Sequence, residues 1–550
     1  MSKKVFAVLF AIGALSLSGV LTSCQKGGTS TSSSLKTSLT IFMNGGNEYE
    51  GRKKDSIWKK IEEDAQVEMQ IEGAAHNSDY YTTLNPMINT GDIPDLIFAV
   101  PTSAGNAYNN WVNQDIVWNI DDLLAEKPGE YPYIETILHS DQFKNLTFGD
   151  GKHTLIPYFT SNSGWGIYYR TDWLINVGYF TEVNGVKIAK TPSTIEEFQD
   201  VLRLFTENDP DQDGKADTYG LSPFGKAFYQ NPLYHAFGVT PDYDIDSAGQ
   251  AEYMLLSPKY KKYLAWINAM YAKGYIDPQF ATNNNSQDRD KFYEGKTGIL
   301  ITNAEQHVSW IASAFENANG KGLLTMGPAP VGTKNLGVEG KGGFSDWGGY
   351  WGGYSIARTC ADPYAALRLM NYLYSPEGSK LRSYGIEGVH YSVVDGKYVP
   401  NIDNRNAEPA GAFSGANSAD GTFEPTGFYK FGSAFSNDID WSEDRTHFSV
   451  HIDPDAIDSK YSALIKQGIA YNTLCTSKLV NVTGFYSSFA TKMKKVEDAA
   501  NTYAINSIMG KKNLTSDYEA LFTTISQPTY DWPNIQKMII EVAKKGGIIS

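Results

Sequence analysis

Three short apolar stretches alternate with two helical patterns between residues 39 and 99: LTIFM (39–43), DSIWKKIEEDA (55–65), VEMQIE (67–72), YYTTLNPMIN (80–89) and DLIFA (95–99). The segment 55–65 places Ile57, Trp58 and Ile61 on one helical face, whereas the segment 67–72 alternates apolar and polar residues as a strand does. A strand–helix–strand–helix–strand series of this length builds a right-handed unit with a parallel sheet. The sequence therefore predicts an α/β fold.

The ends of these strands mark a candidate ligand-binding rim. Residues 44–48 follow the first strand and residues 99–103 follow the third. Because ligands of open parallel sheets bind beyond the carboxyl ends of the strands, both segments are expected to face a bound molecule.

A second α/β block follows. Residues 164–170 have the pattern of a strand, residues 259–273 of an amphipathic helix, and residues 363–384 of a further helix. A helix start is predicted near residue 194, where Ser193 with Glu196, or Thr194 with Glu197, can form a capping box. The last hundred residues are mostly helical in pattern.

The apolar stretch at 296–303 resembles a strand that returns into the first sheet, and residues 354–359 form one more strand. This order predicts two lobes joined by crossing segments. We expect residues 39–157 with 299–353 in lobe 1, and residues 158–298 with 354–550 in lobe 2.

The N-terminus predicts export from the cell. Lys3 and Lys4 precede an apolar run, and Leu21-Thr22-Ser23-Cys24 follows it. This is the pattern of a signal peptide, here residues 1–23, and its last four residues resemble the bacterial lipobox, in which Cys24 becomes a lipid-bearing N-terminus. The alternative is an ordinary cleaved signal with a chance cysteine. Residues 24–38 are rich in Gly, Ser, Thr and Lys, as in a flexible tether.

Composition narrows the classes of partner. The net charge is −15, and it becomes −17 once a signal with two lysines and no acid is removed. Such an acidic surface repels nucleic acid and anionic lipid, so nucleic acid is not an expected partner. Aromatic residues make up 13% of the chain, which is compatible with stacking on sugars or with large cores. Cys360 and Cys475 are expected to be buried or free, although a disulfide between them stays open.

The sequence DPDQDGKAD at 209–217 predicts a calcium loop. It places Asp209, Asp211, Asp213 and Asp217 at positions 1, 3, 5 and 9 of an EF-hand spacing, with a glycine at position 6. The carbonyl of Lys215 would serve at position 7. Position 12 is a glycine rather than the usual glutamate, so a ligand is missing. The alternative is a solvated acidic turn. A bound Ca²⁺ would hold the loop's shape and would not catalyse.

An aromatic, glycine-rich segment covers residues 344–354, and Trp165 has similar glycine neighbours. Glycines let a backbone approach a ligand, and tryptophan and tyrosine faces can stack on it. The segment can be a ligand wall, or a hinge whose tryptophans pack between lobes. Signatures of enzymes are poor: HExxH, GxSxG, GxxxxGK[ST] and CxxC are missing, and the eight histidines are not expected to cluster.

Several segments together resemble the large lipoprotein subgroup of extracellular solute-binding proteins of ABC sugar importers. They occur in the same order across most of the chain, although residues 401–450 fit less well: GDIPDL (91–96), YRTDWL (169–174), TP (191–192) leading into 194–198, the acidic loop (209–220), YEGKTG (293–298), YSPEG (374–378) and YGIEGVHY (384–391).

The resemblance implies a two-lobed fold like that of periplasmic binding proteins, with hinge segments and a cleft between the lobes. It implies a monomer, anchored by lipid outside the membrane, that captures an oligosaccharide and delivers it to an ABC permease. Closure of the hinge on the ligand is the implied mechanism. The resemblance also implies a calcium site, because the acidic loop is similar to a calcium-binding loop of the subgroup.

Candidate ligand contacts follow from position at strand ends and from residue type. Trp165, Trp347, Tyr350 and Trp351 would supply stacking area, and Asn44, Glu48, Asn303 and Asp346 would bind hydroxyl groups. Two rival interpretations remain: a lipid-anchored glycan hydrolase or lyase, and a peptide- or glycan-binding surface module without a permease.

Overall fold

The structure is a computed structural model, and it describes residues 36–43, 56–73, 80–101, 106–149, 151–159, 165–223, 232–283, 286–303, 308–395, 397–407, 461–484 and 486–550. The chain divides into Met1–Lys36 and Thr37–Ser550, and every element below belongs to the second part. The predicted signal, Cys24, Asn44, Glu48 and residues 408–460 lie outside the described residues. None of the helices in the described ranges has the length and apolar character needed to cross a membrane.

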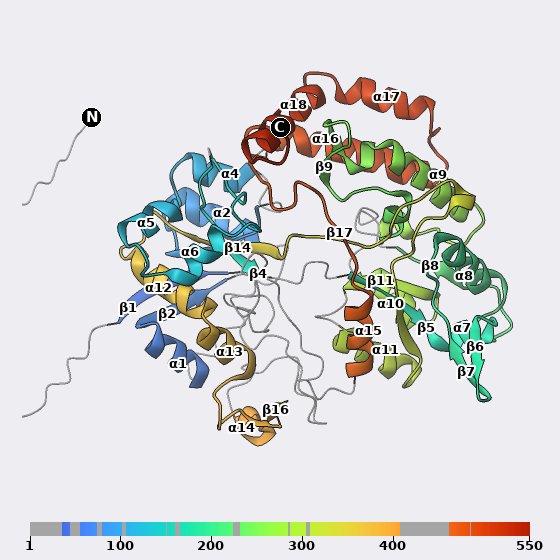
Figure 1. Cartoon of the computed structure of the whole chain (residues 1–550), viewed down its shortest axis with the longest axis horizontal. Coiled ribbons are helices and arrows are strands. Elements are labelled where there is room, and N and C mark those ends of the chain that lie inside the picture. Colours follow the sequence, from blue (N-terminus) through green and yellow to red (C-terminus); the bar gives the residue numbers. More distant parts are fainter. Residues whose placement is uncertain are drawn as a thin grey trace, which may run out of the picture. The chain divides into compact units, whose positions relative to one another are not determined.

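The first sheet has the strand order β2-β1-β3-β14-β4. Its strands β1, β2, β4 and β14 are labelled in Figure 1. Its strands are β1 (Thr37–Phe42), β2 (Val67–Glu72), β3 (Leu96–Ala99), β4 (Ile156–Phe159) and β14 (Tyr350–Ile356). As predicted, β1 is parallel to both β2 and β3. The first strand begins at Thr37, inside the stretch 24–38 that the sequence assigned to the tether.

Helices pack on this sheet through the faces that their sequence periodicity predicts. In α1 (Ser56–Asp64), Ile57, Trp58 and Ile61 are buried. The remaining helices of this part are α2 (Tyr80–Thr90), α4 (Asn106–Asn113), α5 (Ile120–Glu126), α6 (Pro132–Leu138), α12 (Pro363–Tyr374) and α13 (Pro376–Tyr384). The predicted helix at 363–384 is therefore two helices, because Ser375 caps a new helix that starts at Pro376.

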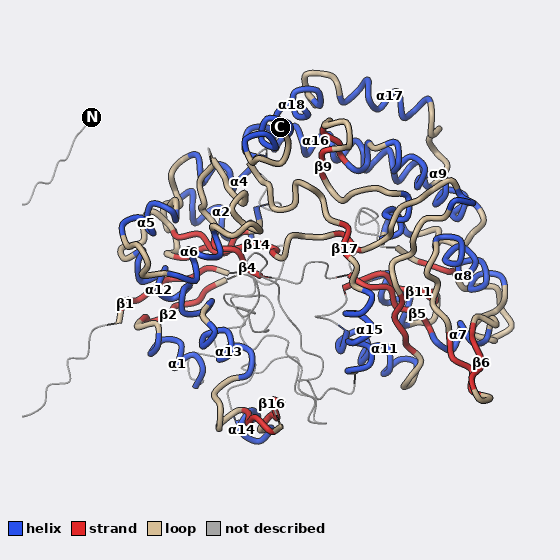
Figure 2. Tube along the Cα trace, in the orientation of Figure 1, coloured by secondary structure: helices blue, strands red, loops and turns tan. Residues whose placement is uncertain are grey.

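The second sheet has the strand order β12-β5-β11-β8. Its strands β5 and β11 are labelled in Figure 2. Its strands are β5 (Trp165–Arg170), β8 (Tyr219–Leu221), β11 (Thr297–Asn303) and β12 (Leu324–Gly327). Residues alternate between two cores along β5: Ile167 and Tyr169 belong to the larger core, and Tyr168 to a smaller one. Both faces of the sheet are therefore covered.

Two sequence expectations about strand placement are wrong. The strand at 296–303 pairs with β5 and β8 of the second sheet and does not return to the first. Conversely, residues 354–356, expected in lobe 2, belong to β14 in the first sheet, and α12 and α13 bury their apolar faces in the same core. Both stretches are apolar enough to enter either sheet, so local pattern does not identify the partner strands.

The remaining elements flank the second sheet or follow it in the chain. They are α7 (Thr171–Asn176), β6 (Phe180–Val183), β7 (Val186–Ala189), α8 (Ile195–Glu207), β9 (Tyr243–Ile245), β10 (Ala251–Tyr253), α9 (Pro258–Ala272), α10 (Gln287–Tyr293), α11 (Val308–Asn319), β13 (Phe344–Ser345), β15 (Tyr391–Val394), β16 (Lys397–Pro400), α14 (Ile402–Ala407), α15 (Ser462–Tyr471), β17 (Leu474–Cys475), α16 (Tyr486–Ile508), α17 (Ser516–Ile525) and α18 (Trp532–Lys545). The capping box predicted at α8 is formed by Thr194 and Glu197.

Candidate functional site

Strand direction places the ends of β1, β3 and β4 at one edge of the first sheet. The strand β14 is antiparallel to both β3 and β4, so it begins at the edge where they end. Tyr350 is opposite Phe159, and Gly353 is opposite Ala99. Tyr350 and Trp351 therefore start a strand at the rim expected from the sequence.

The second sheet has an equivalent edge, where β11 and the parallel β8 end and β5 begins. The last residue of β11, Asn303, is directly opposite Trp165 in the antiparallel register. Residues 160–164 lead from the end of β4 to Trp165, and a second segment leads from β12 to β14. These two segments thus join the strand-end edges of the two sheets.

A pair of tryptophans brings the second edge and the crossing segment together. The rings of Trp165 and Trp347 lie edge to face, with their centroids 6.1 Å apart. Both side chains are half-buried. The indole Nε1 of Trp165 is buried and has no hydrogen-bond acceptor among the residues that the structure describes. The ring contact therefore brings Trp347 to the strand end where the backbone of Asn303 is paired opposite Trp165.

Asp346 fixes the crossing segment to the C-terminal part of the chain. Its carboxylate accepts hydrogen bonds from the Gly348 amide at 2.8 Å and from the Thr476 hydroxyl at 2.7 Å. Its own amide donates to the carbonyl of Cys475 at 3.1 Å, which continues the parallel pairing of β13 with β17. Much of its hydrogen-bonding capacity is used within the protein, which indicates a structural role beside the expected contact with a ligand.

Tyr350 packs beside the first core, where its ring meets Phe143 at 6.2 Å in a T-shaped arrangement. Burial raises the pKa of its hydroxyl well above the usual range. The side chains of Trp351 and Asn303 are outside what the structure describes. Tyr350 therefore has the surroundings of a packing residue.

The carbonyl of Gly348 joins three distant segments, a feature that the sequence did not predict. It accepts hydrogen bonds from Gln142 Nε2 at 2.9 Å and from Asn481 Nδ2 at 2.7 Å. Gly348 has a positive φ of 73°, and a Cβ there would lie 1.9 Å from Asn481 Oδ1. Only glycine fits this position, directly after Trp347.

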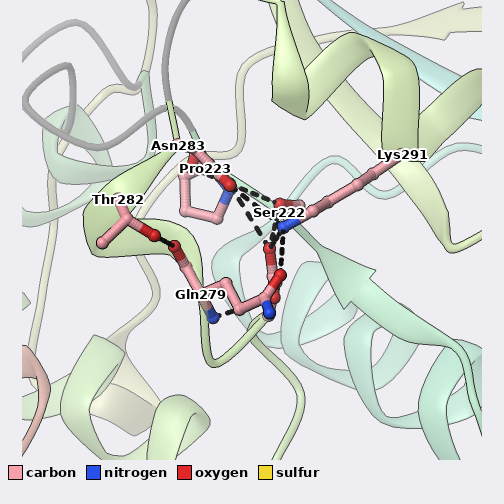
Figure 3. A network of polar contacts seen from close by, with 7 residues as sticks. Ser222, Pro223, Gln279, Thr282, Asn283 and Lys291 are labelled. Carbon is pink, nitrogen blue, oxygen red and sulfur yellow. Dashed lines mark hydrogen bonds and ion pairs between the residues drawn. The ribbon is translucent and has the colours of Figure 1, made fainter.

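A buried polar network supports the end of β8 (Figure 3). Asp277, which is 2% exposed, accepts hydrogen bonds from Lys291 Nζ at 2.5 Å and from Ser222 Oγ at 2.5 Å. Burial alone would raise the pKa of Asp277, but these two donors outweigh it and lower the pKa. Asn283 Nδ2 also donates to Ser222 Oγ, at 2.8 Å. The network fixes the segment that leaves the second sheet at its rim.

The acidic loop brings three of its predicted ligands together. Carboxylate oxygens of Asp209, Asp211 and Asp213 lie within 4.8 Å of one another. Burial, together with the neighbouring charge of Asp213, raises the pKa of Asp211. Lys215 donates from Nζ to Asp213 at 2.6 Å, and this hydrogen bond lowers the pKa of Asp213. Asp217 lies outside the trio and is paired with Lys296 Nζ at 2.8 Å.

The oxygens of the loop fit a cation. The Oδ1 atoms of Asp209, Asp211 and Asp217 are buried, and none has a hydrogen-bond donor among the described residues. Buried acceptors without donors are rare in proteins, and hard oxygen ligands are what Ca²⁺ requires. Gly220, at position 12, cannot carry a ligand, because a Cβ there would lie 2.6 Å from Leu202 Cδ2. That position packs β8 against α8.

Two further expectations concern cysteine and histidine. Cys360 and Cys475 are both free, and burial raises the pKa of the Cys360 thiol to about 12.

The expectation that the histidines do not cluster is wrong for two of them. His139 and His153 lie on either side of Asp121, with ring centroids 5.8 Å apart. They come from separate segments, so spacing along the sequence did not reveal the pair.

A family described as "bacterial extracellular solute-binding protein" matches residues 56–387, more than half of the chain. The polygalacturonan/rhamnogalacturonan-binding protein YtcQ of Bacillus subtilis (strain 168) is 25% identical over 407 residues, which cover 71% of this chain and 75% of that protein.

Solved structures share the predicted two-lobed α/β fold. An HMO binding, ABC-transporter associated solute binding protein from Bifidobacterium longum infantis aligns with a TM-score of 0.63 and 15% identity, over 93% of this chain and 98% of the other. The EF-hand mutant of FusA, an ABC-transporter substrate binding protein of Streptococcus pneumoniae in complex with fructo-nystose, aligns with a TM-score of 0.62 and 16% identity, over 92% and 99%. At these identities the likeness concerns the fold alone.

Proposed function

The chain belongs to the bacterial extracellular solute-binding protein family, and on that premise we propose that it captures an oligosaccharide outside the cell and delivers it to the membrane permease of an ABC transporter. A member of this family binds its solute and leaves it chemically unchanged. The glycan-degrading enzyme considered from the sequence is therefore not proposed.

The observation that carries the proposal is the contact between Trp165 and Trp347 at the rim of the second sheet, where β11 ends at Asn303. Half-buried indole faces provide flat apolar area for a sugar ring, and buried polar atoms beside them can bind hydroxyl groups. The unpaired Nε1 of Trp165 is one such donor. Names of similar proteins agree with this class of ligand: YtcQ is named as a polygalacturonan/rhamnogalacturonan-binding protein, and FusA was solved in complex with fructo-nystose.

Hinge closure would couple binding to delivery. Trp165 begins strand β5 of the second sheet, whereas Tyr350 and Trp351 begin strand β14 of the first sheet. A ligand that touches both edges gains its full set of contacts only when they approach, so binding shifts the population toward the closed state. The bonds of Gly348 with Gln142 and Asn481 fix the segment that joins the edges.

Calorimetry with a panel of neutral and acidic oligosaccharides, amino acids and peptides tests the proposal. We expect heat of binding with oligosaccharides, and chromatography after prolonged incubation should recover the same glycans intact. A panel in which only amino acids or peptides bind would overturn the class of ligand. Shortened glycan products would restore the enzyme alternative.

The acidic loop is proposed to hold a structural Ca²⁺. Asp209, Asp211, Asp213 and Asp217 would supply carboxylate oxygens, and Lys215 its carbonyl, between α8 and β8. The cation would satisfy the three buried oxygens that lack donors. Ca²⁺ should raise the melting temperature of chelator-treated protein, and Asp211→Asn should abolish that rise while leaving glycan binding measurable. An equal rise in wild type and variant would contradict the site.

The lipid anchor at Cys24 is also part of the proposal. A tether on the outer face of the membrane would keep the capture protein at high effective concentration near its permease. Cys24→Ser should move the protein from the membrane fraction into the medium. Retention of the variant in the membrane fraction would contradict lipidation at this residue.

A further inference from the structure

Asp121, His139 and His153 form a compact cluster in the part of the chain that carries the first sheet. Asp121 lies in the first turn of α5, His139 directly follows α6, and His153 lies three residues before β4. Asp121 Oδ1 is 3.0 Å from His139 Nε2, and Asp121 Oδ2 is 2.8 Å from His153 Nδ1. The ligand atoms of all three residues lie within 4.8 Å of one another.

The second nitrogen of His153 fixes how the ring is protonated. His153 Nε2 is 3.2 Å from the carbonyl oxygen of Lys144. A carbonyl only accepts hydrogen bonds, so the tautomer that carries its proton on Nε2 donates to Lys144 and leaves Nδ1 free of a proton. In this tautomer Nδ1 offers its lone pair beside the carboxylate of Asp121, 2.8 Å away, as a metal-binding histidine does.

We propose that Asp121, His139 and His153 form a binding site for Zn²⁺. Two imidazole nitrogens and one carboxylate oxygen are ligands that Zn²⁺ takes in proteins, and water completes a four-coordinate site with three protein ligands. The bond from His153 Nε2 to the Lys144 carbonyl is the outer contact that commonly orients a metal-binding histidine.

Exposure of the three side chains suits an ion that enters from solvent. The side chain of His153 is 8% exposed, that of Asp121 is 33% exposed and that of His139 is 50% exposed. The buried ring and the carboxylate are held in place by the fold, and the exposed ring of His139 can adjust to complete the site. Only small shifts are needed, because tetrahedral ligands about 2.0 Å from zinc lie roughly 3.3 Å from one another.

The site is separate from the proposed ligand rim. His153 precedes β4, whereas the rim lies where β4 ends, at Phe159. A bound Zn²⁺ would link α5, the end of α6 and the segment before β4, and so would stabilise the folded state without touching the solute. The proposal therefore does not depend on the proposed transport function.

The test uses the full, untagged chain after treatment with a chelator. We expect one Zn²⁺ per chain by mass spectrometry, a rise in melting temperature with Zn²⁺, and Co²⁺ absorption bands typical of four-coordinate nitrogen and oxygen ligands. His139→Gln is the first variant, because its exposed side chain can change without loss of the fold. It should weaken Zn²⁺ binding at least about tenfold, as ligand loss does at other sites.

Asp211→Asn is the matched control, because it alters the acidic loop and leaves the histidine cluster intact. It should retain wild-type Zn²⁺ binding, while His139→Gln retains the response to Ca²⁺. Four histidines, at positions 76, 307, 447 and 451, lie outside the described residues. Zn²⁺ binding of equal strength in wild type and His139→Gln would assign the ion to such residues and overturn the proposal. Absence of Zn²⁺ binding in the wild type would overturn it as well, and would leave Asp121 as a hydrogen-bond partner of the two rings.

Discussion

Removal of the Lys291 ammonium group, which pairs with Asp277, should destabilise the part of the protein that carries the second sheet. Lys291 donates to Asp277 Oδ2 at 2.5 Å, to Asn283 Oδ1 at 3.0 Å and to Gln279 Oε1 at 3.2 Å (Figure 3). The variant Lys291→Met retains an unbranched side chain, one atom shorter, and removes all three bonds. The Asp277 carboxylate would keep the Ser222 hydroxyl and the Gln279 amide as donors but would lose its ion-pair partner.

The magnitude follows from burial. Breaking a fully buried ion pair by removing one partner costs about 3–5 kcal/mol, because the remaining charge stays in a low dielectric. The side chain of Asp277 is 3% exposed and that of Lys291 is 21% exposed, so water screens part of the pair. We therefore expect a loss near the lower limit, about 3 kcal/mol. The double variant Asp277→Asn/Lys291→Met leaves no charge buried and should lose only about 1–2 kcal/mol.

Urea unfolding at neutral pH, followed by circular dichroism, measures both losses. The dependence on pH gives a further check. The pKa of Asp277 is lowered in the folded protein, so its stabilisation is present at neutral pH and disappears as the pH falls through that lowered value. The difference between wild type and Lys291→Met should therefore shrink in acid. A loss below about 1 kcal/mol for Lys291→Met, or a larger loss for the double variant, would refute the reasoning.

Two further substitutions have effects that the structure predicts. Gly220→Ala places a Cβ 2.6 Å from Leu202 Cδ2 and 2.8 Å from Leu202 Cα, so overpacking of α8 against β8 should cost about 2 kcal/mol in urea unfolding; an unchanged midpoint would contradict this contact. Burial raises the pKa of Glu497 to about 7, so the stability linked to its neutral form is present below pH 4.5 and is lost as the pH rises through about 7. Glu497→Gln should therefore stabilise the protein by about 1–2 kcal/mol at pH 8 and have little effect at pH 5, and an equal shift in melting temperature at both values would count against burial as the cause.

Features with a local cause could be predicted from the sequence. The alternation in β2, the apolar face of α1 and the capping box of Thr194 with Glu197 each depend on residues a few positions apart. The acidic loop was predictable for the same reason, since Asp209, Asp211 and Asp213 converge within one tight turn. The loop departs from the usual EF-hand pattern at Gly220, where a glutamate is expected. This glycine allows β8 to pack on α8, a contact that the sequence does not display.

Features that depend on distant segments could not be predicted in this way. The strand β11 is apolar enough for either sheet, and only its pairing with β5 and β8 decides which one it joins. Asp346 looked like a residue free to bind hydroxyl groups, yet Thr476 donates to it from 130 positions away. The contact of Asn481 with Gly348 and the pairing of His139 with Asp121 arise in the same manner. Side-chain type indicated candidates, and tertiary contacts decided their surroundings.

The measurement that tests the central claim most directly is calorimetric titration of Trp347→Ala with the tightest-binding oligosaccharide of the panel. Trp118→Ala is the matched control, because this tryptophan packs under the Arg358 guanidinium, 3.7 Å from its ring centroid, in the part of the chain that carries the first sheet. Loss of an interface tryptophan typically costs about 2 kcal/mol, so Kd should rise about 30-fold in Trp347→Ala and stay within about twofold in Trp118→Ala. An unchanged Kd in Trp347→Ala, together with a lowered melting temperature, would show that Trp347 is a packing residue and that the oligosaccharide binds elsewhere.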